Sequence, residues 1–298
     1  MMKATTVPKP TTSPTITPLP EGSRSIGAIL VGEGRLSPSD VDKIEHYARE
    51  QGLRFGDAAI QLQLLAKEDV DFAIARQFNY PILTCGGQNG VGEELIAGYR
   101  PESPLVEPLR ALRSQLSFRW PRDSGRKVIA VTSAERGDGR SWLAANLAIV
   151  FAQIGERTLL LDADLRHPRQ HALFNLNNDV GLSALVTGRA TREIARRIHP
   201  QLRLFVLPSG RLPPNPQELL SGPVFDVVLE QFTEQFDVIV IDTPALAETA
   251  DAQILASRAG TALMVARRNH TRHKYLVNAM RNLSEAGVNV IGSVVQEL

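Results

Sequence analysis

Short apolar runs alternate with amphipathic stretches through the last two thirds of the chain. The runs cover residues 128–132, 158–161, 202–207, 238–241, 262–265 and 290–294. Nearly continuous apolar strands, with helical stretches between them, are typical of a parallel sheet that is buried on both faces. We therefore predict an α/β domain over residues 104–298, in which helices flank a parallel sheet.

Residues 25–83 show a different pattern, in which one segment is repeated. Two segments offset by 29 residues begin at 25–27 and 54–56, and each continues through a short apolar helix, a turn and an Asp-Val-Asp sequence. Ser37 before Pro38 is a typical helix start, because the hydroxyl can cap the first turn and proline fits there. The duplicated helix pair predicts one small all-α module.

Two further segments have compositions of their own. Residues 1–24 are dominated by threonine and proline and carry too little apolar surface to offset the entropy cost of ordering, so we expect a disordered arm. Residues 84–103 are rich in glycine and are predicted to be a linker.

The overall composition excludes several classes of protein. The chain has 298 residues, with 33 basic and 32 acidic side chains and a net charge of +1, so we expect no nucleic-acid partner. One cysteine excludes a disulfide framework and fits a reducing compartment. No stretch approaches the ~20 apolar residues of a membrane span, and the N-terminus lacks the apolar core of a signal peptide. These features predict a cytoplasmic protein.

The apolar run 128–132 leads into a loop of the sequence Ser-Ala-Glu-Arg-Gly-Asp-Gly-Arg-Ser, and a long helix follows. This order is that of a phosphate-binding loop, whose backbone N–H groups and helix N-terminus hold phosphate oxygens. The residues predicted to contact the nucleotide are Arg136, Gly137, Asp138, Gly139, Arg140, Ser141 and Trp142.

Two positions depart from the usual loop. Ala134 replaces the first glycine, and Arg140 replaces the lysine that normally reaches the phosphates. Arginine keeps the positive charge, but its planar fork need not bind phosphate in the same way. Since 27 of the 33 basic residues are arginine, the change is compatible with compositional drift.

Three carboxylates stand where predicted strands end. Asp162 and Asp164 follow the run 158–161, and Asp242 ends the run 238–241. Because parallel strands end at one edge of a sheet, we expect all three carboxylates beside the phosphate loop. One of the first two can hold Mg²⁺ while the other accepts a proton, and Ser141 and Asp242 are further candidates for Mg²⁺. The pattern predicts a site for a nucleoside triphosphate.

These motifs resemble those of the bacterial tyrosine kinases of exopolysaccharide synthesis, of the chain-length-determinant type, a branch of the deviant P-loop ATPases. The resemblance covers about residues 104–298 and depends most on Leu-Leu-Asp-Ala-Asp-Leu-Arg at 160–166. It implies a tyrosine kinase that uses ATP and Mg²⁺. In such an enzyme Asp162 would activate a tyrosine hydroxyl with Arg140 as a further catalytic group, and Ser141, Asp164 and Asp242 would serve Mg²⁺.

The same resemblance implies partners. A separate membrane-embedded chain-length protein would hold the chain at the periphery of the inner membrane and couple it to polysaccharide polymerisation and export. Glu107, Arg110 and Arg113 match the family's oligomerisation motif. Their three-residue spacing places them on one helix face, where they could pair between subunits or simply form a solvated charged surface.

One departure from the family motivates a second hypothesis. The family usually phosphorylates a tyrosine cluster in its C-terminal tail, whereas the tyrosines of this chain are Tyr47, Tyr80, Tyr99 and Tyr275. The acceptor would then be an isolated tyrosine or another protein. Together with Arg140, this suggests as an alternative an ATP-dependent assembly switch that hydrolyses ATP without phosphorylating tyrosine.

The helical module is similar to the N-terminal domain of type II secretion ATPases, some of which bind cyclic di-GMP through repeated short motifs. Here each repeat lacks one element: Ser25 stands at an expected arginine and Gln63 at an expected glycine. The sequence therefore favours a docking module without dinucleotide, and a regulator that responds to cyclic di-GMP is the alternative.

Two aromatic and two basic residues are further candidates for a nucleotide contact. Trp120 and Phe118 are predicted to be packing anchors rather than a stacking platform for a base. Arg267 and Arg268 follow a predicted strand and could approach the base or form an exposed turn.

Overall fold

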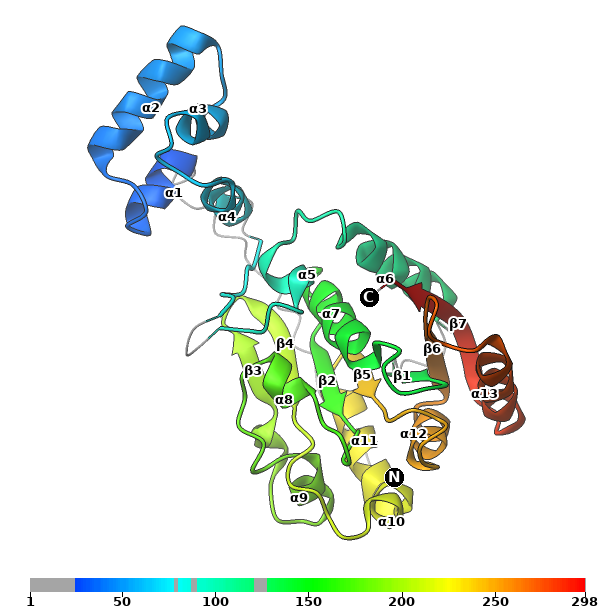
Figure 1. Ribbon diagram of the computed structural model, residues 1–298. Coiled ribbons are helices and arrows are strands. Elements are labelled where there is room, and N and C mark those ends of the chain that lie inside the picture. The colour runs from blue at the N-terminus through cyan, green and yellow to red at the C-terminus, as the bar shows by residue number, and fades with distance from the viewer. Residues whose placement is uncertain (1–24, 78–79, 87–89, 121–127, 298) are drawn as a thin grey trace, which may run out of the picture. The chain divides into compact units, whose positions relative to one another are not determined.

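The computed structural model describes residues 25–77, 80–86, 90–120 and 128–297 (Figure 1). It divides into two compact units, Met1–Tyr80 and Pro81–Leu298, and each has a hydrophobic core of its own. The arm predicted over residues 1–24 lies outside the described residues.

The N-terminal unit consists of two copies of one helix pair. Its helices are α1 (Ile26–Gly32), α2 (Pro38–Gln51), α3 (Phe55–Gln61) and α4 (Lys67–Gln77). Equivalent positions of the two copies supply the core: Leu30, Leu36 and Ile44 from the first, and Ala59, Leu65 and Ala73 from the second. The repeat seen in the sequence is therefore a repeat of structure.

The two copies also share an unusual turn. Gly34 has a φ of +70°, and Gln63, which occupies the equivalent position, has a φ of +56°. This left-handed conformation suits glycine and costs other residues about 1 kcal/mol. The second copy thus keeps the backbone of the first although it lacks the glycine.

The second unit contains one seven-stranded sheet in its described residues. The strands are β1 (Val128–Ser133), β2 (Thr158–Asp162), β3 (Arg196–His199), β4 (Leu202–Leu207), β5 (Val238–Asp242), β6 (Thr261–Arg267) and β7 (Asn289–Gln296). Their order is β3-β4-β2-β5-β1-β6-β7, and every neighbouring pair is parallel except β3 with β4. The predicted α/β class with a mainly parallel sheet is confirmed.

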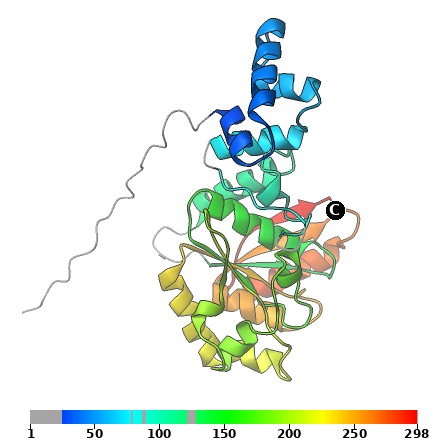
Figure 2. The same cartoon turned by 90° about the vertical axis from the view of Figure 1, so that its left-hand side faces the viewer.

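Helices cover both faces of the sheet (Figure 2). They are α5 (Ile96–Tyr99), α6 (Glu107–Arg119), α7 (Arg140–Gln153), α8 (Gln170–Leu173), α9 (Leu182–Val186), α10 (Pro216–Ser221), α11 (Pro223–Gln235), α12 (Asp251–Ala259) and α13 (His273–Glu285). In β2 the side chains alternate, as a strand requires. Leu160 joins the core that contains α7, whereas Leu159 and Leu161 join the core that contains α11.

The glycine-rich segment 84–103 differs from the linker that we predicted. In its described part, Val91, Leu95 and Ala97 are buried in the core with α7. The buried side chain of Asn146 in α7 accepts a hydrogen bond from Ala97 N at 3.0 Å and donates to Glu94 O at 3.0 Å. Glycines mark turns here, but the apolar residues between them anchor the segment.

Of the two predicted packing anchors, only Trp120 packs. Its ring lies edge-on to Phe151 with the ring centroids 5.8 Å apart, and it is 4% exposed. Phe118 is 80% exposed, because it points away from the face of α6 that carries the buried Leu109 and Leu116. Among the described residues, no helix is long and apolar enough to cross a membrane.

Candidate functional site

The phosphate loop connects β1, a fully buried strand in the middle of the sheet, to the start of α7. Gly137 and Gly139 have φ values of +85° and +88°, a conformation that residues with a side chain rarely adopt. Such turns direct backbone N–H groups inward, and the N-terminus of α7 adds its positive dipole end. The loop can therefore cradle an anion.

Arg140 is 7% exposed and bonds to groups of the protein itself. Its Nε donates to Thr243 O at 2.9 Å, and its Nη1 donates to Ser133 Oγ at 2.7 Å and to Glu135 O at 3.1 Å. Its Nη2 lies 3.8 Å from the Asp164 carboxylate. The guanidinium thus ties the phosphate loop to the end of β5, a task that the single ammonium of lysine could not do in the same way.

Asp162 and Asp242 are register partners at the ends of the adjacent strands β2 and β5, and both are 0% exposed. Burial, and next the charge of Asp242, hold the pKa of Asp162 well above its usual range. Burial raises the pKa of Asp242 to about 6, although the amide of Gln170 and the charge of Arg140 act in the opposite direction. The edge of the sheet therefore brings together two carboxylates that repel each other.

Gln170 is a residue of this site that the sequence did not indicate. Its Nε2 donates to Asp242 Oδ2 at 2.7 Å and to Ser141 O at 3.0 Å, and its backbone N donates to Asp162 Oδ2 at 2.9 Å. One buried residue thus connects both strand ends to α7. No local pattern marks it, because these contacts join positions up to 72 residues apart.

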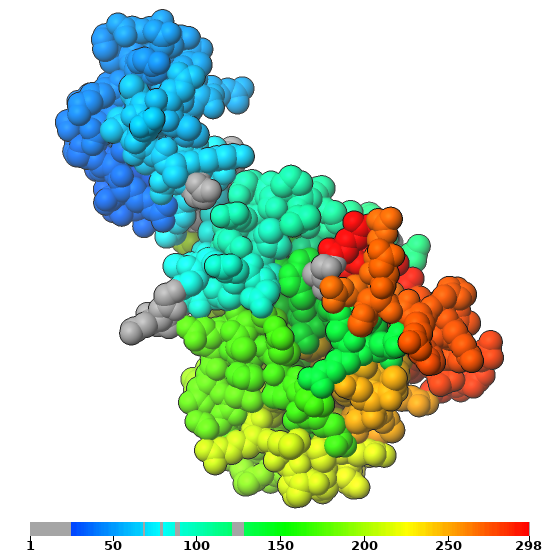
Figure 3. All heavy atoms as spheres, viewed as in Figure 1, coloured from blue at the N-terminus to red at the C-terminus, as the bar shows by residue number. Residues whose placement is uncertain are grey.

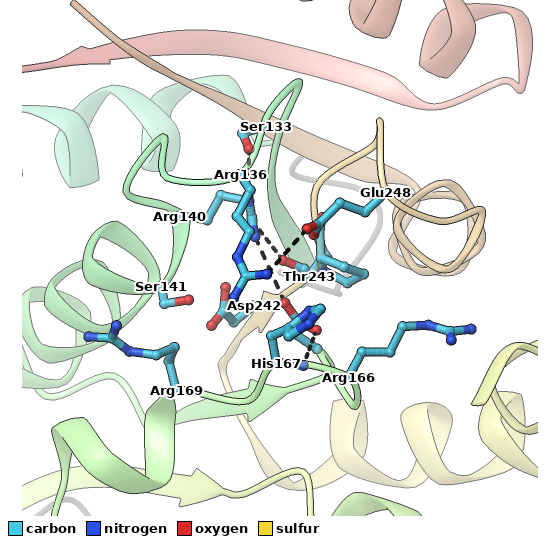
Figure 4. Close-up of polar contacts among 12 residues, drawn as sticks. Ser133, Arg136, Arg140, Ser141, Arg166, His167, Arg169, Asp242, Thr243 and Glu248 are labelled. Carbon is cyan, nitrogen blue, oxygen red and sulfur yellow. Dashed lines mark hydrogen bonds and ion pairs between the residues drawn. The ribbon is translucent and has the colours of Figure 1, made fainter. Parts of the chain in front are cut away.

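A pocket of about 570 Å³ opens over the phosphate loop (Figure 4). Six of the predicted nucleotide contacts line it, namely Arg136, Gly137, Gly139, Arg140, Ser141 and Trp142, together with Asp164. Asp138, Asp162 and Asp242 do not line the pocket. His167 and Arg169 lie on the opposite side of it, on the loop that follows β2.

The donor set fits Mg²⁺. Asp162 and Asp242 each have one buried carboxylate oxygen without a hydrogen-bond partner, which is the arrangement that a cation would satisfy. Within the described residues, no three His, Cys, Asp or Glu side chains form a ready metal cage. Mg²⁺ usually binds through one or two carboxylates, substrate phosphates and water, and the strand ends supply such carboxylates.

The three residues of the predicted oligomerisation motif lie on α6. Glu107 has a side chain that is 74% exposed and lies 3.4 Å from Arg110 Nη1. Arg110 also donates to Pro101 O at 2.6 Å, and Arg113 donates to Val150 O at 3.1 Å. Both arginines are therefore engaged within their own chain.

A phosphate cradle beside strand-end carboxylates defines the class of the P-loop nucleotide-binding proteins. Residues 124–296 match the family model described as ParA: NUBPL iron-transfer P-loop NTPase. Within this class, the chain is 36% identical over 201 residues to the tyrosine-protein kinase YwqD of Bacillus subtilis, an alignment that covers 67% of this chain and 84% of YwqD. The chain belongs to the bacterial tyrosine kinase family.

Solved structures agree with this assignment. The kinase domain of Escherichia coli tyrosine kinase ETK aligns with a TM-score of 0.67 and 30% identity, over 72% of this chain and 82% of that domain. The chimerical protein CapA2B2 aligns with a TM-score of 0.65 and 31% identity, over 76% of this chain and 99% of that one.

Some relatives are much longer. EpsB of Ralstonia nicotianae is 37% identical over 209 residues, which are 70% of this chain but only 27% of EpsB. The similarity of residues 25–83 to the N-terminal domain of type II secretion ATPases stays a prediction.

Proposed function

We propose that this chain is a protein tyrosine kinase that uses ATP and Mg²⁺ and regulates exopolysaccharide polymerisation and export. Membership of the bacterial tyrosine kinase family supports the proposal. The observation that carries it is the pairing of Asp162 with Asp242 at the edge of the sheet beside the phosphate loop. A proton acceptor and a metal site are the two functions that phosphoryl transfer to a hydroxyl requires.

The proposed roles follow the geometry. The backbone N–H groups around Gly137 and Gly139 hold the phosphates, while Arg140 fixes the loop and supplies positive charge. Ser141, Asp164 and Asp242 would hold Mg²⁺, which neutralises charge on the phosphates. Asp162 accepts the proton of the tyrosine hydroxyl, and its raised pKa makes it a stronger base than an exposed aspartate.

The acceptor within the chain is proposed to be Tyr275. All four tyrosines are described, and Tyr275 is 42% exposed, whereas the other three are partly buried. Tyr47 and Tyr99 donate hydrogen bonds through their hydroxyls to Gln61 and to Glu93 O. Phosphopeptide mapping of the protein after incubation with ATP tests this, and Tyr275→Phe should remove most of the incorporated phosphate.

We propose a peripheral position at the inner membrane through a separate membrane-embedded chain-length protein, together with self-association through α6. The Glu107 side chain is 74% exposed and pairs with Arg110 in its own chain, a pair that it would exchange for one with a neighbouring subunit. Arg110 and Arg113 would have to exchange their present bonds for bonds between subunits, so Glu107→Lys should lower the assembly size in light scattering.

A second function has one specific observation in its favour. The donors of Arg140 are engaged with Thr243, Ser133 and Glu135, which suits a loop that senses nucleotide more than one that drives transfer. The alternative is therefore an ATP-dependent assembly switch that hydrolyses ATP without phosphorylating tyrosine.

One assay separates the two. The full chain is incubated with labelled ATP, Mg²⁺ and the cytoplasmic segment of the partner, and phosphotyrosine and free phosphate are both measured. The kinase predicts phosphotyrosine that is lost in Asp162→Asn and kept in the matched control Asp179→Asn, which changes an exposed aspartate. Release of phosphate without phosphotyrosine would establish the switch instead.

A further inference from the structure

The phosphate loop is held from outside by the segment that joins β6 to α13. His270 Nε2 lies 3.0 Å from Arg136 O, Arg272 N donates to Glu135 Oε2 at 3.0 Å, and Thr271 Oγ1 donates to Asp138 Oδ1 at 2.5 Å. In Figure 3 the orange atoms of this segment adjoin the green atoms of the phosphate loop. Residues that are more than 130 positions apart therefore determine the shape of the loop together.

Asp138 is the centre of this contact. Its side chain is 0% exposed and does not line the pocket. Its Oδ2 accepts a hydrogen bond from Glu135 N at 3.0 Å, and its Oδ1 accepts the bond from Thr271. A buried carboxylate is costly unless it is hydrogen-bonded. These bonds keep Asp138 inside the loop, between Gly137 and Gly139.

The hydroxyl of Thr271 makes two bonds at once. It accepts from Arg267 N at 2.7 Å, which closes the turn after β6, and it donates to Asp138. The turn is therefore fixed by the same atom that fixes the phosphate loop. Valine has nearly the shape of threonine but offers neither bond, whereas serine offers both.

We propose that Thr271 is a positioning residue for the phosphates: through Asp138 it holds Gly137 and Gly139 in the left-handed conformation that binds them. Without it, the free protein samples other loop shapes, and the apparent affinity for nucleotide falls in proportion to the competent fraction. Bound nucleotide restores the loop, so turnover at saturation changes little. The proposal rests on the proposed function only in requiring that the pocket binds a nucleoside triphosphate.

The test compares Thr271→Val, Thr271→Ser and the matched control Thr233→Val in the full chain. Thr233 is a half-buried residue of α11 whose hydroxyl donates within its own helix, to Glu230 O. Equilibrium titration with a fluorescent ATP analogue and Mg²⁺ gives Kd, and steady-state release of phosphate gives kcat and KM. We expect Thr271→Val to raise Kd and KM about tenfold, which equals about 1.4 kcal/mol, with kcat within about twofold of wild type.

We expect Thr271→Ser and Thr233→Val to bind like wild type. An unchanged Kd in Thr271→Val, or an equal loss in Thr271→Ser, would overturn the proposal, as would a fall in kcat alone. If Thr271→Val does not fold, as shown by its thermal unfolding, Thr271→Ala provides the same comparison, because alanine also offers neither bond and adds no bulk. The titration does not depend on phosphate transfer, so absence of phosphotyrosine in wild type would refute the kinase and leave this result standing.

Discussion

The two units of this chain differ in the kinds of side chain that they bury. In the described part of the helical module, no polar or charged side chain is buried, and the core is apolar throughout. The sheet domain buries a polar cluster at one edge, consisting of Asp138, Arg140, Asp162, Asp164, Gln170 and Asp242. Buried polar groups lower the stability of the fold unless each is paired. Such a cluster therefore indicates a functional site, because stability alone does not favour it. The core of the helical module is thus stabilised by apolar packing. In the sheet domain, part of the interior is occupied instead by polar groups suited to chemistry.

The largest effect is expected from Asp162, which ends β2, and from Asp164, which follows it. Asp162→Asn removes the proposed proton acceptor and should lower the rate of tyrosine phosphorylation about a thousandfold at every pH, within the range of general-base effects. Asp164→Asn, which alters a residue that lines the pocket, should instead weaken the response to Mg²⁺. Rates measured against Mg²⁺ concentration check this. If Asp164→Asn loses the rate and Asp162→Asn keeps it, the two roles are reversed.

The next effect concerns Arg140. Arg140→Ala leaves Thr243 O without its donor and removes one of the two donors to Glu135 O, so it should lower the free energy of unfolding by about 2–4 kcal/mol. Arg140→Lys keeps the charge but cannot reach all three acceptors, so we expect the free energy of unfolding to fall by about 1–2 kcal/mol. We also expect this variant to turn over ATP faster than wild type. Urea unfolding and steady-state kinetics of both variants measure this. Slower turnover in the lysine variant would show that arginine itself contacts the phosphates.

A smaller effect is expected from the burial of the Asp242 carboxylate. Folding raises the pKa of Asp242 from its ordinary 3.8 to about 6, so the contribution of this group to stability is fully present below pH 4 and is lost as the pH rises through 6. Without Mg²⁺, Asp242→Asn should therefore be more stable than wild type at pH 7, by up to about 3 kcal/mol.

Thermal unfolding between pH 4 and pH 8 tests this. Addition of Mg²⁺ and nucleotide should make wild type the more stable of the two proteins, since Asp242→Asn lacks a carboxylate for the metal. Equal stability of the two proteins at pH 7 without metal would show that folding does not raise the pKa of Asp242.

The smallest effect belongs to the helical module and compares its two copies. Gln63→Gly relieves the left-handed backbone and should stabilise the module by about 0.5 kcal/mol, whereas Gly34→Gln should destabilise it by about 1 kcal/mol. Hydrogen exchange of α1 to α4 in the full chain measures both changes. Neither should alter nucleotide binding, because the two positions lie in the other unit.

Most of the sheet could be predicted because its strands are buried. All six predicted strands are present, whereas β3 was missed: its sequence Arg-Arg-Ile-His is mostly polar, and it pairs on one side only, at the antiparallel edge. Asp162 and Asp242 could be placed together because parallel strands end at the same edge. Gln170 and Thr271 could not, since their roles depend on contacts with distant parts of the chain that leave no periodic pattern.

The bonds of Asn146 also decide how the sheet domain can be prepared by itself. A fragment that begins at residue 104 would lose Ala97 and Glu94, the partners of this side chain, and would expose the apolar surface that Leu95 covers. A fragment that begins at Pro81 retains all of them. The earlier start is the one expected to yield a soluble recombinant domain for crystallisation or binding assays.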